Sequence, residues 1–161
     1  LLYNASPFTG VNLGADLVVR LAEHPNIVGV KDTSGNIVQI AEIARMAPKD
    51  FATLAGSGSF FLPTLAVGGV GGILALANVA ADLCVELYDR FQDGDLDAAR
   101  RLHQRLLPVN AVVTSKYGIA GLKAALDLLG FVGGLPRPPL RPLTPEQHED
   151  VRRTLTAAEL I

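Results

Sequence analysis

The chain has 161 residues, of which 49% are apolar, and its formal net charge is -2 at pH 7. This length can bury a hydrophobic core, and the nearly balanced charge excludes the strongly basic class of nucleic-acid-binding proteins and any attraction to acidic membranes. The single cysteine, Cys84, excludes an internal disulfide framework and favours a reducing compartment. We therefore expect a globular cytoplasmic protein that binds neither nucleic acid nor membrane.

Apolar residues follow the spacing of strands and of helices in turn along the first part of the chain. The pattern predicts strands at residues 1–4, 27–31, 51–55 and 72–76, and helices at residues 13–23, 37–46, 60–67 and 79–91. Residues 5–10 are expected to form a loop, and Asn78 is a candidate cap for the helix that follows it. Strands that alternate with helices pair in parallel through right-handed crossovers, so the sequence predicts an α/β fold.

The first residue is Leu1 and the only methionine is Met46. Because residues 1–4 already have the pattern of a strand, we expect the chain to begin inside a longer protein. A mitochondrial location therefore stays open beside the cytoplasmic one.

Residues 51–81 carry no charge and would be long enough to span a bilayer. The run nevertheless contains six glycines and Pro63, and it divides naturally into a strand, a short helix and a strand. Buried parallel strands are apolar throughout, so we expect these residues to lie in a sheet core rather than in a membrane.

Two parallel α/β architectures compete for this pattern: an open doubly wound sheet and a (β/α)8 barrel. The dinucleotide-binding fingerprint of the open sheet is missing, because Phe61 stands where a third glycine should follow Gly56 and Gly58. A barrel is therefore favoured, and because a complete one takes about 250 residues, four strands would form half of it. We expect residues 1–92 to form this half-barrel and residues 93–161 to form a C-terminal helical region.

In the helical region, Asp95 can cap a helix that runs to about residue 107 and is broken by Pro108. A second helix is predicted at residues 109–129, with Gly130 as its stop. Residues 133–142 are too rich in proline for a helix or a central strand. Thr144 then opens the last helix with a capping box and a proline at its first position.

Lys31 ends the predicted strand at residues 27–31 and is the leading candidate for a catalytic residue. A lysine at the end of a buried strand lies partly in a medium of low dielectric constant, where the charged ammonium is disfavoured and the neutral amine can act as a nucleophile. The alternative is a strand-end lysine that extends into water. The other three lysines, Lys49, Lys116 and Lys123, lie in a turn or on a helix and are expected to be solvated.

Several short motifs resemble a known enzyme family. They are Tyr3 and Asn4 with Thr9 and Gly10, PNIVGVK at residues 25–31, GSG at residues 56–58, GGI at residues 71–73 and ANV at residues 77–79. In order and spacing they resemble the dihydrodipicolinate synthase and N-acetylneuraminate lyase family of class I pyruvate aldolases. By this resemblance the chain corresponds to the C-terminal half of a family member. Residues 116–123 and 137–140 are most similar to the 4-hydroxy-2-oxoglutarate aldolase branch.

The resemblance implies a fold, a site and partners. The fold would be a (β/α)8 TIM barrel, of which the chain would supply strands 5 to 8 plus a C-terminal helical extension. Lys31 would form the imine with a small 2-oxo acid, Tyr3 would move protons, and Gly56 and Ile73 would line the substrate pocket. Family members need no cofactor or metal and are usually homotetramers, so a homo-oligomer is expected.

The function implied is a Schiff-base lyase that cleaves 4-hydroxy-2-oxoglutarate to pyruvate and glyoxylate. Dihydrodipicolinate synthases usually carry an arginine immediately before the Thr-Gly pair, to hold the carboxylate of the second substrate, whereas Phe8 stands there. An aromatic ring cannot bind a carboxylate in this way, which argues against aspartate semialdehyde.

Three alternatives stay open. The first is dihydrodipicolinate synthase or a related 2-keto-3-deoxy sugar acid aldolase. The second is a metal-dependent aldolase or hydrolase, for which His24, His103 and His148 are too scattered to form an obvious ligand set. The third is a non-catalytic, truncated half-barrel that serves as a scaffold, and we expect these 161 residues to be inactive alone if pocket residues lie elsewhere.

Overall fold

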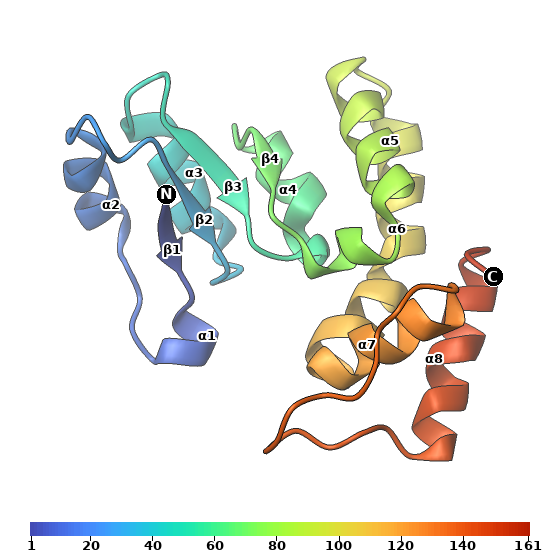
Figure 1. Ribbon diagram of the computed structural model, residues 1–161. Coiled ribbons are helices and arrows are strands. Elements are labelled where there is room, and N and C mark those ends of the chain that lie inside the picture. Colours follow the sequence, from blue (N-terminus) through green and yellow to red (C-terminus); the bar gives the residue numbers. More distant parts are fainter. The chain divides into compact units, whose positions relative to one another are not determined.

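The computed structural model describes residues 1–161 and divides into two compact units, Leu1–Leu74 and Ala75–Ile161. The first contains all the β-strands and is called the sheet unit, and the second is called the helical unit (Figure 1). Helix α5 (Ala81–Gln92) thus belongs with the helices that follow it in sequence rather than with the sheet.

The sheet unit contains four parallel strands in the order β1-β2-β3-β4. Their bounds are β1 (Leu2–Asn4), β2 (Gly29–Asp32), β3 (Ala52–Ala55) and β4 (Gly71–Gly72). The connections contain α1 (Ser6–Thr9), α2 (Ala15–Ala22), α3 (Ile37–Met46), the 3-10 turn η1 (Gly58–Phe60) and α4 (Phe61–Ala66). Strand and helix alternation was therefore predicted correctly, whereas the expected loop at residues 5–10 contains one helical turn.

The core of the sheet unit lies between the sheet and the helices α2 and α3. Val18 of α2, Val30 of β2 and Ile43 of α3 are completely buried there and belong to one apolar cluster with Phe51. The helical spacing in α2 and α3 and the two-residue spacing in β2 place these side chains on facing surfaces. Their burial removes apolar surface from water and fixes β2 against the helices.

The predicted second half of a (β/α)8 barrel, strands 5 to 8, is wrong for this chain. The structure has one open sheet of strands 1 to 4, and the similarities with known proteins reported below give no support to strands 5 to 8. The physical reason is that four alternating strands and helices do not by themselves fix their place in a larger barrel. Here β1 and β4 pair only with β2 and β3, so the sheet is open.

The helical unit begins with a 3-10 turn, η2 (Ala75–Asn78), followed by α5. Three further α-helices follow, α6 (Leu96–Ala111), α7 (Gly118–Leu128) and α8 (Pro145–Ala157), and a π-helical turn, η3 (Val112–Lys116), joins the first two of them. The core of the helical unit includes Leu87 of α5, Leu106 of α6 and Leu155 of α8, all of which are buried.

Several details of the helices differ from the prediction. The helix α6 does not end at Pro108 but continues through it to Ala111. Pro108 has no amide hydrogen, so the Gln104 carbonyl loses its helical partner, and because both residues are exposed this carbonyl can bond to water. The predicted strand at residues 72–76 is shorter and earlier, because residues 75–78 form η2.

Among the predicted helix caps and stops, those at Thr144 and Gly130 are confirmed, whereas that at Asn78 is wrong. The predicted capping box at Thr144 is confirmed, since its side chain accepts from the Gln147 backbone and the Gln147 side chain accepts from the Thr144 backbone. Gly130 follows α7 in the left-handed conformation, with φ of 83°, as expected of a stop. Asn78 does not cap α5, because its amide donates to the Ala75 carbonyl instead.

No helix in the structure combines the length and the apolar character that crossing a membrane requires. The uncharged run at residues 51–81 is divided among β3, η1, α4, β4 and η2, as the glycines in it predict.

Candidate functional site

Lys31 and Tyr3 lie side by side on neighbouring strands near their carboxyl ends. The parallel register pairs Tyr3 of β1 with Lys31 of β2. The Lys31 Nζ atom lies over the Tyr3 ring, 4.4 Å from the ring centroid, which is the geometry of a cation–π contact. The two residues expected to carry the chemistry are therefore brought together, although 27 residues separate them along the chain.

Gly56 and Ile73 follow the ends of the next two strands, β3 and β4. The register places Leu54 of β3 beside Lys31 and beside Gly71 of β4, and Gly56 and Ile73 each come two positions later. The register therefore places Tyr3 and Lys31 on one face of the sheet, and Gly56 and Ile73 lie just beyond the ends of the next two strands. The Ile73 amide donates to the Ala55 carbonyl at 2.9 Å and extends the pairing of β4.

Gly56 has a second reason to be a glycine. Its amide donates to the Asp32 carbonyl at 2.6 Å, which draws the end of β3 against the end of β2. A Cβ atom at Gly56 would lie 2.6 Å from that carbonyl oxygen and would also overlap the Thr33 hydroxyl. Close packing of two strand ends therefore requires glycine here, whatever it contributes to a pocket.

The face that carries these residues is open in this chain. Tyr3 is 53% exposed and Ile73 is 44% exposed, whereas Lys31 is partly buried. The Lys31 side chain is therefore neither fully buried in the interior nor extended freely into water. Its amine lies against an aromatic ring.

Directly behind Lys31, the opposite face of the sheet holds a network of buried polar groups. Asp32 is completely buried, and one of its carboxylate oxygens accepts from the Asn4 amide at 2.7 Å and from the Gln39 amide at 3.1 Å. The other oxygen accepts from the backbone amide of Ser34 at 2.8 Å and from its hydroxyl. Asn12 connects the side chains of Asn4 and Gln39.

This network ties β1, β2 and α3 together at the strand ends where Tyr3 and Lys31 lie, so it positions the candidate site. The residues in it were not predicted to be functional. A signal was nevertheless present, since the two-residue spacing put Asp32 on the same face as the apolar Val30. A carboxylate on a buried face needs hydrogen-bond partners, and asparagine or glutamine nearby can supply them.

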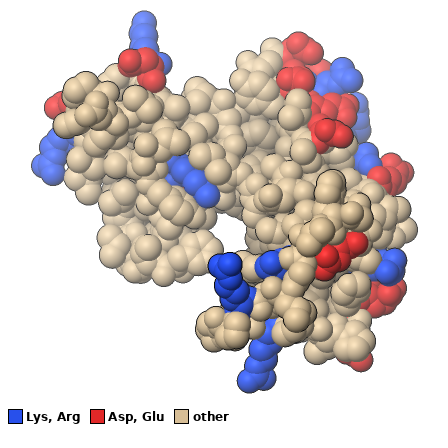
Figure 2. Space-filling model, viewed as in Figure 1, with Lys and Arg blue, Asp and Glu red and all other residues tan.

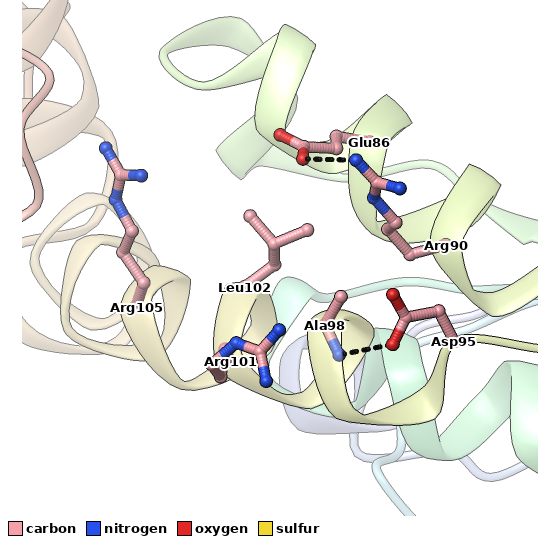
Figure 3. Close-up of a pocket in the computed structure, with 7 residues that line it drawn as sticks. All are labelled: Glu86, Arg90, Asp95, Ala98, Arg101, Leu102 and Arg105. Carbon is pink, nitrogen blue, oxygen red and sulfur yellow. Dashed lines mark hydrogen bonds and ion pairs between the residues drawn. The ribbon is translucent and has the colours of Figure 1, made fainter.

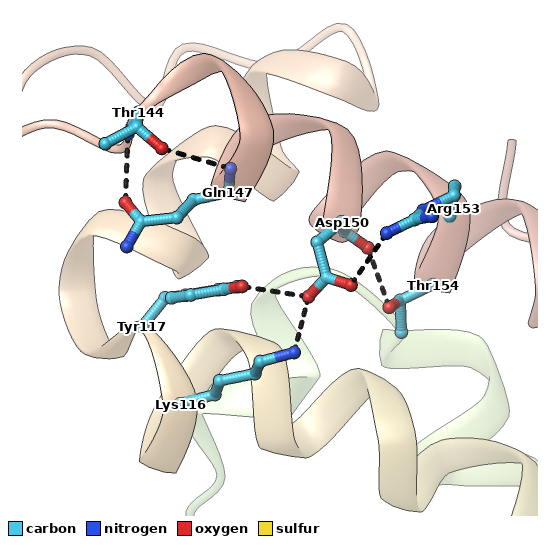
Figure 4. A network of polar contacts seen from close by, with 7 residues as sticks. All are labelled: Lys116, Tyr117, Thr144, Gln147, Asp150, Arg153 and Thr154. Atoms are coloured by element: carbon cyan, nitrogen blue, oxygen red, sulfur yellow. Dashed lines mark hydrogen bonds and ion pairs between the residues drawn. The ribbon is translucent and has the colours of Figure 1, made fainter.

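Two of the lysines expected to be solvated have specific partners in the helical unit. Lys116 pairs with Asp150 at 2.7 Å, and the Tyr117 hydroxyl donates to the same carboxylate at 3.0 Å (Figure 4). The bond to Asp150 raises the pKa of Lys116, and the same bond lowers the pKa of the carboxyl. The Lys123 ammonium donates to the Gly133 carbonyl at 2.6 Å. Lys116 also lies over a ring, 5.2 Å from the Tyr117 centroid, whereas the ring under Lys31 comes from a neighbouring strand of the sheet.

The chain matches the family model described as "Dihydrodipicolinate synthetase family" over residues 1–158. A 4-hydroxy-tetrahydrodipicolinate synthase of Archaeoglobus fulgidus is 42% identical over 161 residues, which are 100% of this chain and 56% of that protein. The corresponding synthase of Methanopyrus kandleri is 39% identical, over 100% of this chain and 54% of its own length. The chain thus spans about half the length of these curated relatives.

Solved structures show the same similarity. A dihydrodipicolinate synthase of Cyanidioschyzon merolae with lysine bound has a TM-score of 0.94 and 34% identity, over 99% of this chain and 54% of that one. YagE of Escherichia coli K12, described as a prophage protein of the dihydrodipicolinic acid synthase family in complex with pyruvate, has a TM-score of 0.91 and 28% identity, over 99% and 56%. None of these similarities singles out the 4-hydroxy-2-oxoglutarate aldolase branch.

Proposed function

Because the chain belongs to the dihydrodipicolinate synthetase family, whose members are lyases of the aldolase type, we propose that it carries the Schiff-base residues of a pyruvate-dependent lyase. The observation that carries the proposal is the position of the Lys31 amine, 4.4 Å from the centre of the Tyr3 ring. The two come from adjacent strands at the carboxyl edge of a parallel sheet, the edge where α/β enzymes of this kind bind their substrates.

The chemistry assigns one task to each residue. The neutral Lys31 amine attacks the carbonyl carbon of pyruvate, and loss of water leaves an iminium ion on the former carbonyl carbon. The iminium withdraws electrons, so a proton can leave the adjacent methyl group to give an enamine, which then attacks an aldehyde. The Tyr3 hydroxyl is proposed to carry the protons of these steps, and hydrolysis of the imine returns the free amine.

Gly56 and Ile73 are proposed to line the pocket for the 2-oxo acid. They lie just beyond the ends of β3 and β4, where a missing side chain and a backbone edge let a small planar acid approach. The chain covers about half of each relative, so other pocket residues are proposed to come from further polypeptide or from another copy. A homotetramer, which the family resemblance implies, and a cytoplasmic location remain predictions.

For the aldehyde, the relatives favour the 4-hydroxy-tetrahydrodipicolinate synthase reaction, which joins pyruvate to aspartate semialdehyde. One observation argues against aspartate semialdehyde and keeps glyoxylate as a second candidate. Phe8 of α1 is 80% exposed and occupies the position where the synthases usually have a carboxylate-binding arginine. The rates of pyruvate consumption with each aldehyde distinguish the two, and the relatives lead us to expect the faster rate with aspartate semialdehyde.

Borohydride reduction in the presence of pyruvate, followed by peptide mass mapping, tests the proposal. We expect a pyruvyl adduct on the peptide that contains Lys31 and its loss in Lys31→Arg, which keeps the charge but cannot form the imine. Lys49→Arg, in a turn of the same unit, is the matched control and should keep the adduct. An adduct on another lysine, or none in the longest polypeptide that carries this chain, would refute the proposal.

A further inference from the structure

The helical unit contains a groove between α5 and α6 that plays no part in the proposed Schiff-base chemistry. Its volume is about 390 Å3, and seven residues line it: Glu86, Arg90, Asp95, Ala98, Arg101, Leu102 and Arg105. Three of the seven are arginines, although arginine and lysine together make up only 14 of the 161 residues, and charged side chains of both signs are frequent on the helical unit (Figure 2). Figure 3 shows Leu102 near the middle, with Arg105 on one side and Arg90 on the other.

The two carboxylates of the groove are already engaged. Glu86 pairs with Arg90 at 3.6 Å, one turn away on α5. The Asp95 carboxylate accepts from the Ala98 amide at 3.0 Å and caps the first turn of α6. A capping carboxylate is held toward the helix end, so neither acid is placed to neutralise Arg101.

Arg101 and Arg105 supply the positive charge of the groove. They lie four residues apart, so they share one face of α6. Arg105 is held at the rim, where its Nε donates to the Ala158 carbonyl at 2.7 Å and a terminal nitrogen lies 3.3 Å from the Glu159 carboxylate. Arg101 makes no ion pair with any acidic side chain, so its planar group of donors is open to a ligand.

We propose that this groove binds a small dianion, a phosphate monoester or a dicarboxylate, at Arg101, with Arg105 and Arg90 on either side. Guanidinium groups bind both kinds of oxygen pair with two parallel hydrogen bonds. The volume is at the lower end of that of small-molecule sites and exceeds what a bare phosphate needs. Ala98 and Leu102 form an apolar floor for a short carbon body.

Calorimetric titration of the whole chain with phenyl phosphate and with succinate, at constant ionic strength, tests this site. We expect saturable binding of at least one of them, weakened about tenfold or more in Arg101→Gln. Arg100→Gln is the matched control, because Arg100 is next to Arg101 in the sequence but is exposed, does not line the groove and pairs with Asp97 at 2.7 Å. It should bind as the unmodified chain does.

The ligand that binds more tightly identifies the chemical class. Absence of saturable binding of both ligands would overturn the proposal, as would equal weakening by Arg100→Gln and Arg101→Gln, since that would indicate only a general attraction to positive charge. Circular dichroism of both variants establishes that α6 is intact. The Schiff-base trap at Lys31 should be unchanged in both, so this proposal and the proposed function fail independently.

Discussion

At the scale of single residues, the buried Asp32 carboxylate is the group on which the candidate site depends most. Asp32→Asn keeps the shape but turns one acceptor into a donor that faces the donors of Asn4, Gln39 or Ser34. We expect the free energy of unfolding to fall by about 1 to 3 kcal/mol, the usual cost of an unsatisfied buried polar group. Urea denaturation measures it, with the exposed Asp50→Asn as a control expected to change little. Equal stability of the two variants would contradict this account.

At the scale of elements, the attachment of α8 to η3 depends on Asp150, which binds Lys116, Tyr117 and Arg153 (Figure 4). The lowered pKa of Asp150 makes this stabilisation complete above the normal carboxyl range and lost as the pH falls. Because the pKa of Lys116 is raised, the stabilisation by its pair with Asp150 is complete below the normal pKa range of lysine and is lost as the pH rises above it. Because the pair is solvent-screened, we expect Asp150→Asn to lower the Tm at pH 7 by at most about 2 to 4 °C. Calorimetry should show that this difference shrinks as the pH falls below the normal carboxyl range, and that Glu149→Gln, whose partner is the exposed Arg152, has little effect.

At the scale of the whole molecule, Cys84 is the only thiol and reports the opening of the helical unit. It is 7% exposed on α5, and burial raises its pKa to about 11. Because the thiolate is the reactive form, we expect labelling by an aromatic disulfide at pH 8 to be about a hundredfold slower in the native chain than in denaturant. Absorbance of the released thiolate follows the reaction, and Cys84→Ser gives the background. Rapid labelling of the native chain would show that α5 is not packed as described.

Much of the sheet unit could be predicted from the sequence, because local patterns determine it. The helix α3 has its predicted bounds, and the glycine motifs correctly marked the ends of β3 and α4. Pairs between distant residues could not be predicted from spacing alone. The pairing of Tyr3 with Lys31 was predicted from the resemblance to a family. The Asp32 network was predicted neither from the spacing nor from the resemblance. The assignment to strands 5 to 8 failed because a four-stranded pattern does not by itself fix its place in a larger fold.

The outer strands of the sheet have a consequence for how copies of the chain meet. β1 offers only three residues and β4 only two, both glycines, to any neighbouring strand. A short edge strand presents few unpaired amides and carbonyls, so pairing with the sheet of another copy forms few hydrogen bonds. Because these edge strands are so short, strand-to-strand association of copies is disfavoured even without the charged residues or prolines that protect longer edge strands.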